Sequence, residues 1–188
     1  MALAAVRRQS PEQLEWLGAS PLGNAWTLRV LEDLLTLQLE DGTLHASAGR
    51  AVGNWWRILT LHYLAVSRRP EVAGPSLTFA DLPAGRTYEP VYRRRVVERL
   101  CQTVGRNREA LLQASKAIGG RMATLGDLAM DFQVYPRVAV QLVWYEGDSE
   151  LAPSASLLLP GNIESFFCPE DIVVLSERLV ARLSGGSF

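Results

Sequence analysis

The side chains best suited to form a ligand site gather in one short stretch of the chain, residues 144–153. This stretch holds two large aromatics and three carboxylates: Trp144, Tyr145, Glu146, Asp148 and Glu150. The alternating apolar run at residues 138–143 predicts that the stretch begins where a strand leaves a sheet. Aromatics beside polar groups at a strand end are typical of a ligand pocket. They are also typical of a solvated turn, and both interpretations stay open.

Divalent metal binding by the three carboxylates is chemically feasible, because hard cations prefer carboxylate oxygens. However, alternate residues of an extended strand point to opposite faces, and residues on a turn diverge. No histidine lies near this stretch to assist. We therefore predict that Trp144 is buried, that Gly147 permits a sharp turn, and that Asp148 and Glu150 face water without binding metal.

Three classes of function fit these residues. Our leading hypothesis is a non-catalytic accessory domain that holds a small molecule or a segment of another protein in an aromatic-rimmed cleft. The candidate ligand-binding residues are Tyr88, Arg94, Arg137, Trp144, Tyr145, Asp148 and Glu150. The alternative is an enzyme with Asp148 and Glu150 as acid/base residues and Arg94 or Arg137 orienting an anionic substrate.

The third class is a structural or oligomerisation module. Phe166 and Phe167 precede the last predicted helix, and they either pack inward or form an exposed apolar patch at a homodimer contact. The sequence identifies no cofactor. It contains no Gly-x-Ser-x-Gly, no dinucleotide fingerprint and no paired-histidine metal motif, which disfavours an enzyme that relies wholly on its own side chains.

The histidines and cysteines are expected to be structural. His62 lies in the most apolar predicted helix, which favours a buried ring bonded to a backbone carbonyl, and His45 is expected to be exposed. Cys101 falls on the inward half of an amphipathic helix, as an inert core thiol does. Cys168 sits at a helix N-terminus that stabilises thiolates, but the acidic residues 170–171 oppose that effect.

Four arginines on one predicted helix offer a site for a phosphate, a carboxylate or a stacked base: Arg93, Arg94, Arg95 and Arg99. Glu89 and Glu98 are placed to pair with them, so a solvated, salt-bridged face is the favoured interpretation.

Composition excludes several classes. A chain of 188 residues with 48% hydrophobic and 21% charged residues suits one globular domain over residues 1–188. The net charge of −1 argues against a nucleic-acid partner. The apolar run at residues 52–66 is interrupted by polar residues and does not predict a membrane span. Residues 1–11 contain no signal-peptide core, so we expect a cytoplasmic protein.

The first part of the chain, residues 1–50, is predicted to form a helix and a hairpin layer. Ser10 and Pro11 open a helix that reaches residue 17. A loop at residues 18–23 precedes three strands, at residues 26–30, 35–39 and 44–47, with a turn at Asp41–Gly42. A helix at residues 53–67 is apolar nearly all round, which predicts a central buried helix.

The rest of the chain adds helices and a second set of strands. One helix is expected to open at Thr87, with Pro90 in its first turn. Its buried stripe is expected to consist of Tyr92, Val96, Leu100 and Val104. Other predicted elements are a helix at residues 107–118, an antiparallel hairpin at residues 127–144, a strand at residues 156–159 and a helix at residues 169–183. This order predicts an α+β fold: a mainly antiparallel sheet packed against about four to five helices.

Three blocks of residues resemble a family known as domain of unknown function 3786. The first is residues 79–85 with Tyr88 and residues 93–95; the second is residues 118–120 with 126–127; the third is residues 144–150 with Pro153 and residues 169–171. The resemblance covers about residues 53–183 and implies no established activity. Longer members of the family it resembles are often accompanied by cysteine-rich, iron–sulfur-like segments or lie near corrinoid and one-carbon genes.

This chain departs from the family pattern at two places. Residues 148–152 stand where the family has Asp-Glu-Glu-Phe-Pro, and Leu159–Pro160 stand where it has Phe-Asp. A polar site formed by those carboxylates in relatives is therefore weakened here. The two cysteines, Cys101 and Cys168, do not form a cysteine-rich segment, so we do not expect an iron–sulfur role to carry over.

Overall fold

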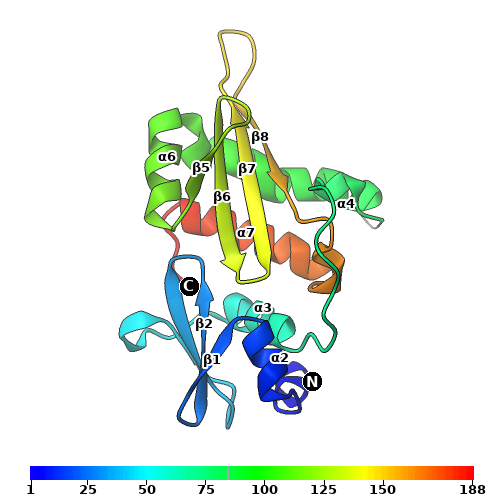
Figure 1. The fold of residues 1–188 in the computed structure, drawn as a ribbon. Coiled ribbons are helices and arrows are strands. Elements are labelled where there is room, and N and C mark those ends of the chain that lie inside the picture. Colours follow the sequence, from blue (N-terminus) through cyan, green and yellow to red (C-terminus); the bar gives the residue numbers. More distant parts are fainter. Residues whose placement is uncertain (84) are drawn as a thin grey trace.

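The computed structural model describes residues 1–83 and 85–188, and it contains two four-stranded antiparallel sheets. Strand order follows the chain in both, β1-β2-β3-β4 and β5-β6-β7-β8. Figure 1 shows the first sheet beside the lower end of the second. The expected α+β class with antiparallel pairing is confirmed, although the strands divide between two sheets.

The first sheet and the two helices before it form the N-terminal part of the fold. Their bounds are α1 Ala2–Val6, α2 Pro11–Trp16, β1 Ala19–Leu22, β2 Ala25–Val30, β3 Asp33–Gln38 and β4 Leu44–His45. Ser10 caps α2 as predicted, because its hydroxyl accepts from the Gln13 N–H. The predicted loop at residues 18–23 is wrong, since β1 pairs there with β2. β1 is short and contains Pro21, so it has no apolar alternation.

The second sheet is covered on one face by helices, which lie behind it in Figure 1. The strands are β5 Arg121–Ala123, β6 Leu128–Tyr135, β7 Val138–Tyr145 and β8 Ser154–Leu158. The helices of this part of the chain are α3 Asn54–Leu64, α4 Gly85–Tyr92, α5 Arg99–Gln102, α6 Arg108–Ala117 and α7 Pro169–Leu183. Of these, α3 lies below the second sheet, beside the first sheet, in Figure 1. Short 3₁₀ turns are η1 Ser47–Gly49, η2 Phe79–Asp81, η4 Val104–Arg106 and η5 Ile163–Ser165.

One bent helix is continuous from α4 to α5 through η3 (Arg93–Glu98), whose turns are π-helical. The helix begins at Gly85, two residues before the predicted opening at Thr87, so Pro90 lies inside the helix and not in its first turn as predicted. Proline has no N–H to donate within a helix, and the wider turns of η3 begin three residues after it. The predicted inward stripe is confirmed at Tyr92, Val96 and Leu100, which are buried.

α3 is less enclosed than its composition predicts. Its inner face is buried, and the Tyr63 ring stacks on Tyr135 of β6 at a centroid distance of 4.6 Å. Trp55 and Ile58 on the other face are 54% and 41% exposed. The expectation of a helix buried all round is therefore wrong, because only one side of α3 meets other elements.

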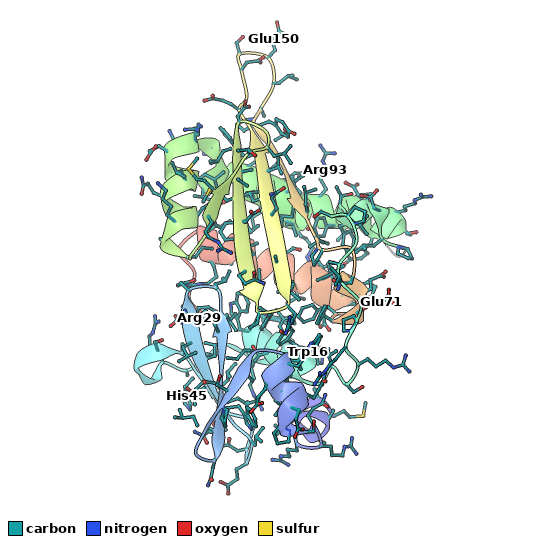
Figure 2. The ribbon with its side chains drawn as sticks, viewed as in Figure 1. Trp16, Arg29, His45, Glu71, Arg93 and Glu150 are labelled. Carbon is teal, nitrogen blue, oxygen red and sulfur yellow. The ribbon has the colours of Figure 1, made fainter. Side chains whose placement is uncertain are left out.

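The loop between β7 and β8 separates a buried aromatic from exposed acids, as the alternation in β7 predicts. Trp144 is 1% exposed, and its indole Nε1 donates to the Gly105 carbonyl at 2.8 Å. Asp148 is exposed, and its Oδ1 accepts from the N–H groups of Glu150 (2.7 Å) and Leu151 (2.8 Å). These bonds lower the pKa of the Asp148 carboxyl. Glu150 lies at the tip of this projecting loop (Figure 2).

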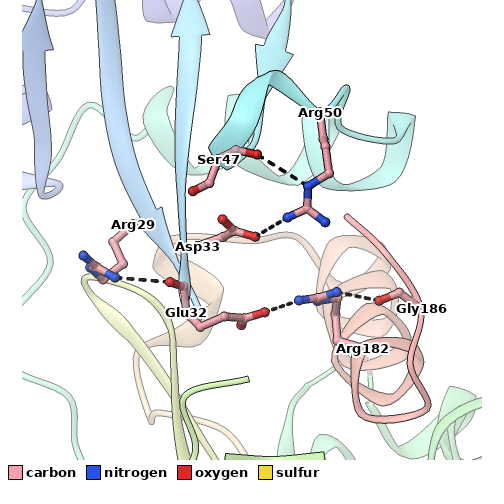
Figure 3. A network of polar contacts seen from close by, with 7 residues as sticks. All are labelled: Arg29, Glu32, Asp33, Ser47, Arg50, Arg182 and Gly186. Carbon is pink, nitrogen blue, oxygen red and sulfur yellow. Dashed lines mark hydrogen bonds and ion pairs between the residues drawn. The ribbon is translucent and has the colours of Figure 1, made fainter. Parts of the chain in front are cut away.

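A polar network joins the β2–β3 turn of the first sheet to helix α7, which lies behind the second sheet (Figure 3). The β2–β3 turn presents Glu32 to Arg182 of α7, and Arg182 also donates to the Gly186 carbonyl at 2.6 Å. The next residue, Asp33, pairs with Arg50 at 3.2 Å. The same turn places the Leu31 N–H 3.2 Å from the Val134 carbonyl of β6.

Trp144→Ala should lower the free energy of unfolding by about 3–5 kcal/mol, because it empties a filled core position and leaves the Gly105 carbonyl unpaired. Asp148→Asn, four residues away on the exposed loop, should stay in the narrow range of ordinary surface substitutions. Urea unfolding of both variants measures the difference. A larger loss for Asp148→Asn would show that the acidic loop, and not Trp144, supports the fold.

Arg182→Met should lower the free energy of unfolding by about 1–3 kcal/mol, because it leaves the partly buried Glu32 carboxylate without its cation. Arg50→Met is the matched control, because Arg50 pairs with Asp33, the residue next to Glu32. The Arg50 side chain is 62% exposed against 13% for Arg182, so its loss should cost under about 1 kcal/mol. Equal effects in thermal unfolding would contradict a special role for the Arg182–Glu32 contact.

Candidate functional site

A cleft of about 390 Å³ lies between β8 and the bent helix, and we call it the edge cleft. Its lining comes from the η2 turn, from the helix face that looks toward β8, and from the strand itself. The lining residues are Thr78, Phe79, Ala80, Glu89, Tyr92, Arg93, Val97, Glu98, Cys101, Tyr145 and residues 153–157. Figure 2 places Arg93 on the side of the sheet where β8 lies.

β8 is the last strand of its sheet, so its outer side faces the cleft and not another full strand. One residue beyond β8, Leu159 pairs with Leu77 on this outer side. The Leu159 N–H donates to the Leu77 carbonyl at 2.7 Å, and the Leu77 N–H donates to the Leu159 carbonyl at 2.9 Å. This two-bond bridge closes one end of the cleft.

The chain leaves β8 directly after that bridge because of a capping box. The Thr78 N–H and hydroxyl both donate to Asp81 Oδ2, at 2.8 and 2.7 Å. The Asp81 N–H in turn donates to the Thr78 carbonyl. These bonds lower the pKa of the Asp81 carboxyl. Gly85 then lies against η2, where an added Cβ would be 1.7 Å from the Phe79 carbonyl oxygen. Only glycine fits at this start of the helix.

The floor of the edge cleft is aromatic and its rim is charged. The Phe79 ring stacks on Tyr92 with centroids 4.3 Å apart and planes 5° apart. Glu89, Arg93 and Glu98 lie on the helix side. None of the three forms an ion pair with any residue in the described ranges 1–83 and 85–188. Their charges are therefore available to a ligand.

Cys101 lies in the same cleft with a half-buried thiol. Burial raises the pKa of the Cys101 thiol, and the nearby Arg93 guanidinium opposes that rise in part. A raised pKa keeps the group as a thiol near neutral pH, so it is a weak nucleophile. The thiol can nevertheless be used as a chemical reporter of whether the cleft is occupied.

The seven candidate residues from the sequence do not come together. Tyr145 is 45% exposed and lines the edge cleft, whereas its neighbour Trp144 points into the core. Tyr88 lines a second cavity of about 310 Å³, which shares Phe79 with the edge cleft. Arg94 is exposed on the helix and lines neither cavity.

The other three candidates lie elsewhere. Arg137 is at the turn between β6 and β7, where its Nε donates to the Trp16 carbonyl at 2.8 Å and its guanidinium covers the Trp16 ring. Asp148 and Glu150 lie on the projecting loop and line neither cavity. Asp148 is engaged in holding that loop, which is a structural use of its carboxylate.

Two expectations for polar residues of the helices are wrong. His62 is not a buried ring bonded to a backbone carbonyl, because its side chain is 40% exposed and its Nδ1 lies 2.7 Å from Asp171 Oδ2. Arg95 pairs with Glu177 of α7, with N–O distances of 2.6 and 2.9 Å, and not with a glutamate of its own helix. Both contacts arise because α7 packs against α3 and against η3.

His45 is half-buried instead of exposed, because β4 pairs with β3 on one side and the chain returns to Ala51 on the other. Phe166 and Phe167 are buried against Tyr63, so the prediction of an exposed dimer patch at these two residues is wrong.

Cys168 as a whole residue is exposed, but its thiol loses some contact with water, and this desolvation raises the pKa of the thiol. The helix N-terminus therefore does not activate it as a thiolate.

Within the described residues, no three histidine, cysteine or acidic side chains gather closely enough to hold a metal ion. None of the described helices is both long enough and apolar enough to cross a membrane.

Sequence reasoning missed most of the edge cleft. Arg93, Val97 and Cys101 come from the helix, but the cleft also needs strand residues from 153–157, far along the chain. The available signal was the short strand between Pro153 and Pro160, since flanking prolines are typical of an edge strand.

Comparison with known families assigns the chain to a group defined by sequence. The model of the family described as domain of unknown function (DUF3786) matches residues 11–182. The match begins in α2, so the first sheet also belongs to the family region, and the expected start near residue 53 is wrong. Neither a curated protein nor a solved structure shows significant similarity to the chain. The chain belongs to the DUF3786 family.

Proposed function

We propose that this protein is a non-catalytic binding module whose ligand occupies the edge cleft. The observation that carries the proposal is a cavity of about 390 Å³ that opens beside an edge strand and is lined by both aromatic and charged side chains. Clefts of a few hundred Å³ with an apolar floor and a few polar groups are the usual form of a ligand site.

The chemistry of the lining supports binding more than catalysis. The Cys101 thiol, which has the raised pKa described above, has no histidine beside it among the lining residues to act as a base. The Tyr92 hydroxyl donates to Ser176 Oγ at 3.0 Å, and burial raises its pKa to about 12. Both groups therefore stay protonated near neutral pH.

The walls favour a ligand of mixed character. The stacked rings of Phe79 and Tyr92, together with Val97, offer apolar contact. Glu89 and Glu98 outnumber Arg93, so the rim attracts a group with positive charge as well as one that accepts hydrogen bonds.

The neighbouring cavity at Tyr88 is a weaker choice. Arg95 lines it, but its guanidinium is already held by both Glu177 oxygens and donates to the Tyr88 hydroxyl at 3.2 Å. A ligand there would compete with an existing bidentate pair. The edge cleft has no such competition among the described residues.

A fragment library screened by thermal shift on the Cys168→Ser variant tests this proposal, because Cys101 is then the single thiol. Fragments that raise Tm should also slow alkylation of Cys101 several-fold, since a bound molecule covers the thiol. Alkylation is run at mildly alkaline pH, where more of the Cys101 thiol is ionised.

The matched control is Cys101→Ser, which retains Cys168 outside the edge cleft. The same fragments should leave alkylation of Cys168 unchanged. Stabilising fragments that fail to protect Cys101, or a library in which no fragment stabilises the protein, would contradict the proposal.

A further inference from the structure

The hydrogen-bonding direction of β8 follows from its bridge to Leu77. Leu159 directs both its N–H and its C=O outward, to Leu77. Backbone groups of alternate residues in an antiparallel strand point to the same side. Leu157 and Ala155 therefore also direct their N–H and C=O outward, toward the edge cleft, while Ser156 and Leu158 pair inward with β7.

These outward groups lack partners in the part of the chain that the structure describes. Within residues 1–83 and 85–188, neither the N–H nor the C=O of Ala155 or Leu157 forms a backbone hydrogen bond to a turn or a loop. Leu157 is only 3% exposed. Backbone groups that are buried without a partner are costly, and proteins normally satisfy them. A ligand with its own N–H and C=O groups would satisfy them here.

The positions of these groups fit one class of ligand. Leu77 already occupies the first place of a further strand beside β8, and η2 then carries the chain away from the next places. An extended peptide that lies beyond Leu77 meets Leu157 and then Ala155 at strand spacing. Recognition of a peptide through an open sheet edge is an established physical mode.

The walls of the cleft also suit a peptide. Side chains of an extended segment alternate between two faces, so every second one would face the helix. There it would meet Tyr92 and Val97, with Glu89 and Glu98 at the rim. An apolar residue followed two places later by lysine or arginine matches that surface.

A protected edge is the competing explanation, because β8 is short and prolines flank it at positions 153 and 160. Those prolines stop the strand from growing at its ends. They do not cover Ala155 or Leu157, which lie between them and line the cleft.

We infer that the ligand of the edge cleft is an extended peptide segment of another protein, which adds to the sheet as a strand beside β8 and bonds to the backbone of Leu157 and Ala155. This inference rests on the proposed function and names the class of ligand for the same site.

The test uses displayed short random peptides selected on the full chain, followed by affinity measurement on Ala155→Pro. Proline at this position removes one outward N–H and leaves the inward pairing with β7 intact. Selected peptides should bind Ala155→Pro about tenfold or more weakly. Ser149→Pro, in the exposed loop before β8, is the matched control and should keep the full affinity.

A second measurement on the wild-type chain does not depend on how Ala155→Pro folds. N-methylation of a selected peptide, one amide at a time, should weaken binding at every second position only. Equal affinity for wild type and Ala155→Pro, no alternation with N-methylation, or no selected peptide at all would overturn the inference. If fragments still protect Cys101 in those cases, the edge cleft remains a binding site for another kind of ligand; if they do not, the proposed function fails too.

Discussion

The two hydrogen bonds between Leu77 and Leu159 are the contact on which the edge cleft depends. They hold a segment from the middle of the chain against the end of β8, and this pairing involves one residue from each side. The Thr78–Asp81 capping box then turns the chain away before a second pair forms. The sheet therefore ends in a strand that is anchored at one end and open along the rest. A longer pairing would have filled the edge with this chain's own backbone.

Two further contacts keep the helix at a fixed position beside that edge. Stacking of Phe79 on Tyr92 joins η2 to the first half of the bent helix. At the other end, the Trp144 indole donates to Gly105, in the turn that follows α5. The helix therefore contacts η2, the segment that follows the Leu77 bridge, and also the strand β7. The cleft between these contacts has walls set by the core, as a preformed binding site requires.

The sequence predicted the parts of the fold that depend on local pattern. Apolar alternation identified the β6–β7 hairpin and the burial of Trp144, and Pro169 marked the start of α7. Short strands such as β1 and β5 have no alternation and were missed. The site was largely beyond prediction, because it depends on pairings between distant residues. Leu77 and Leu159 are one example, and Arg95 with Glu177, 82 positions apart, is another.

Amide hydrogen exchange along β8, followed by NMR in the free protein, tests the open edge most directly. The Ser156 and Leu158 amides pair with β7 and should be strongly protected. The Ala155 and Leu157 amides have no backbone partner on the outer side and should exchange faster than the two amides that alternate with them. Uniform protection from Ala155 to Leu158 would show that the outer edge of β8 is already hydrogen-bonded and would contradict an edge that is free to bind a peptide.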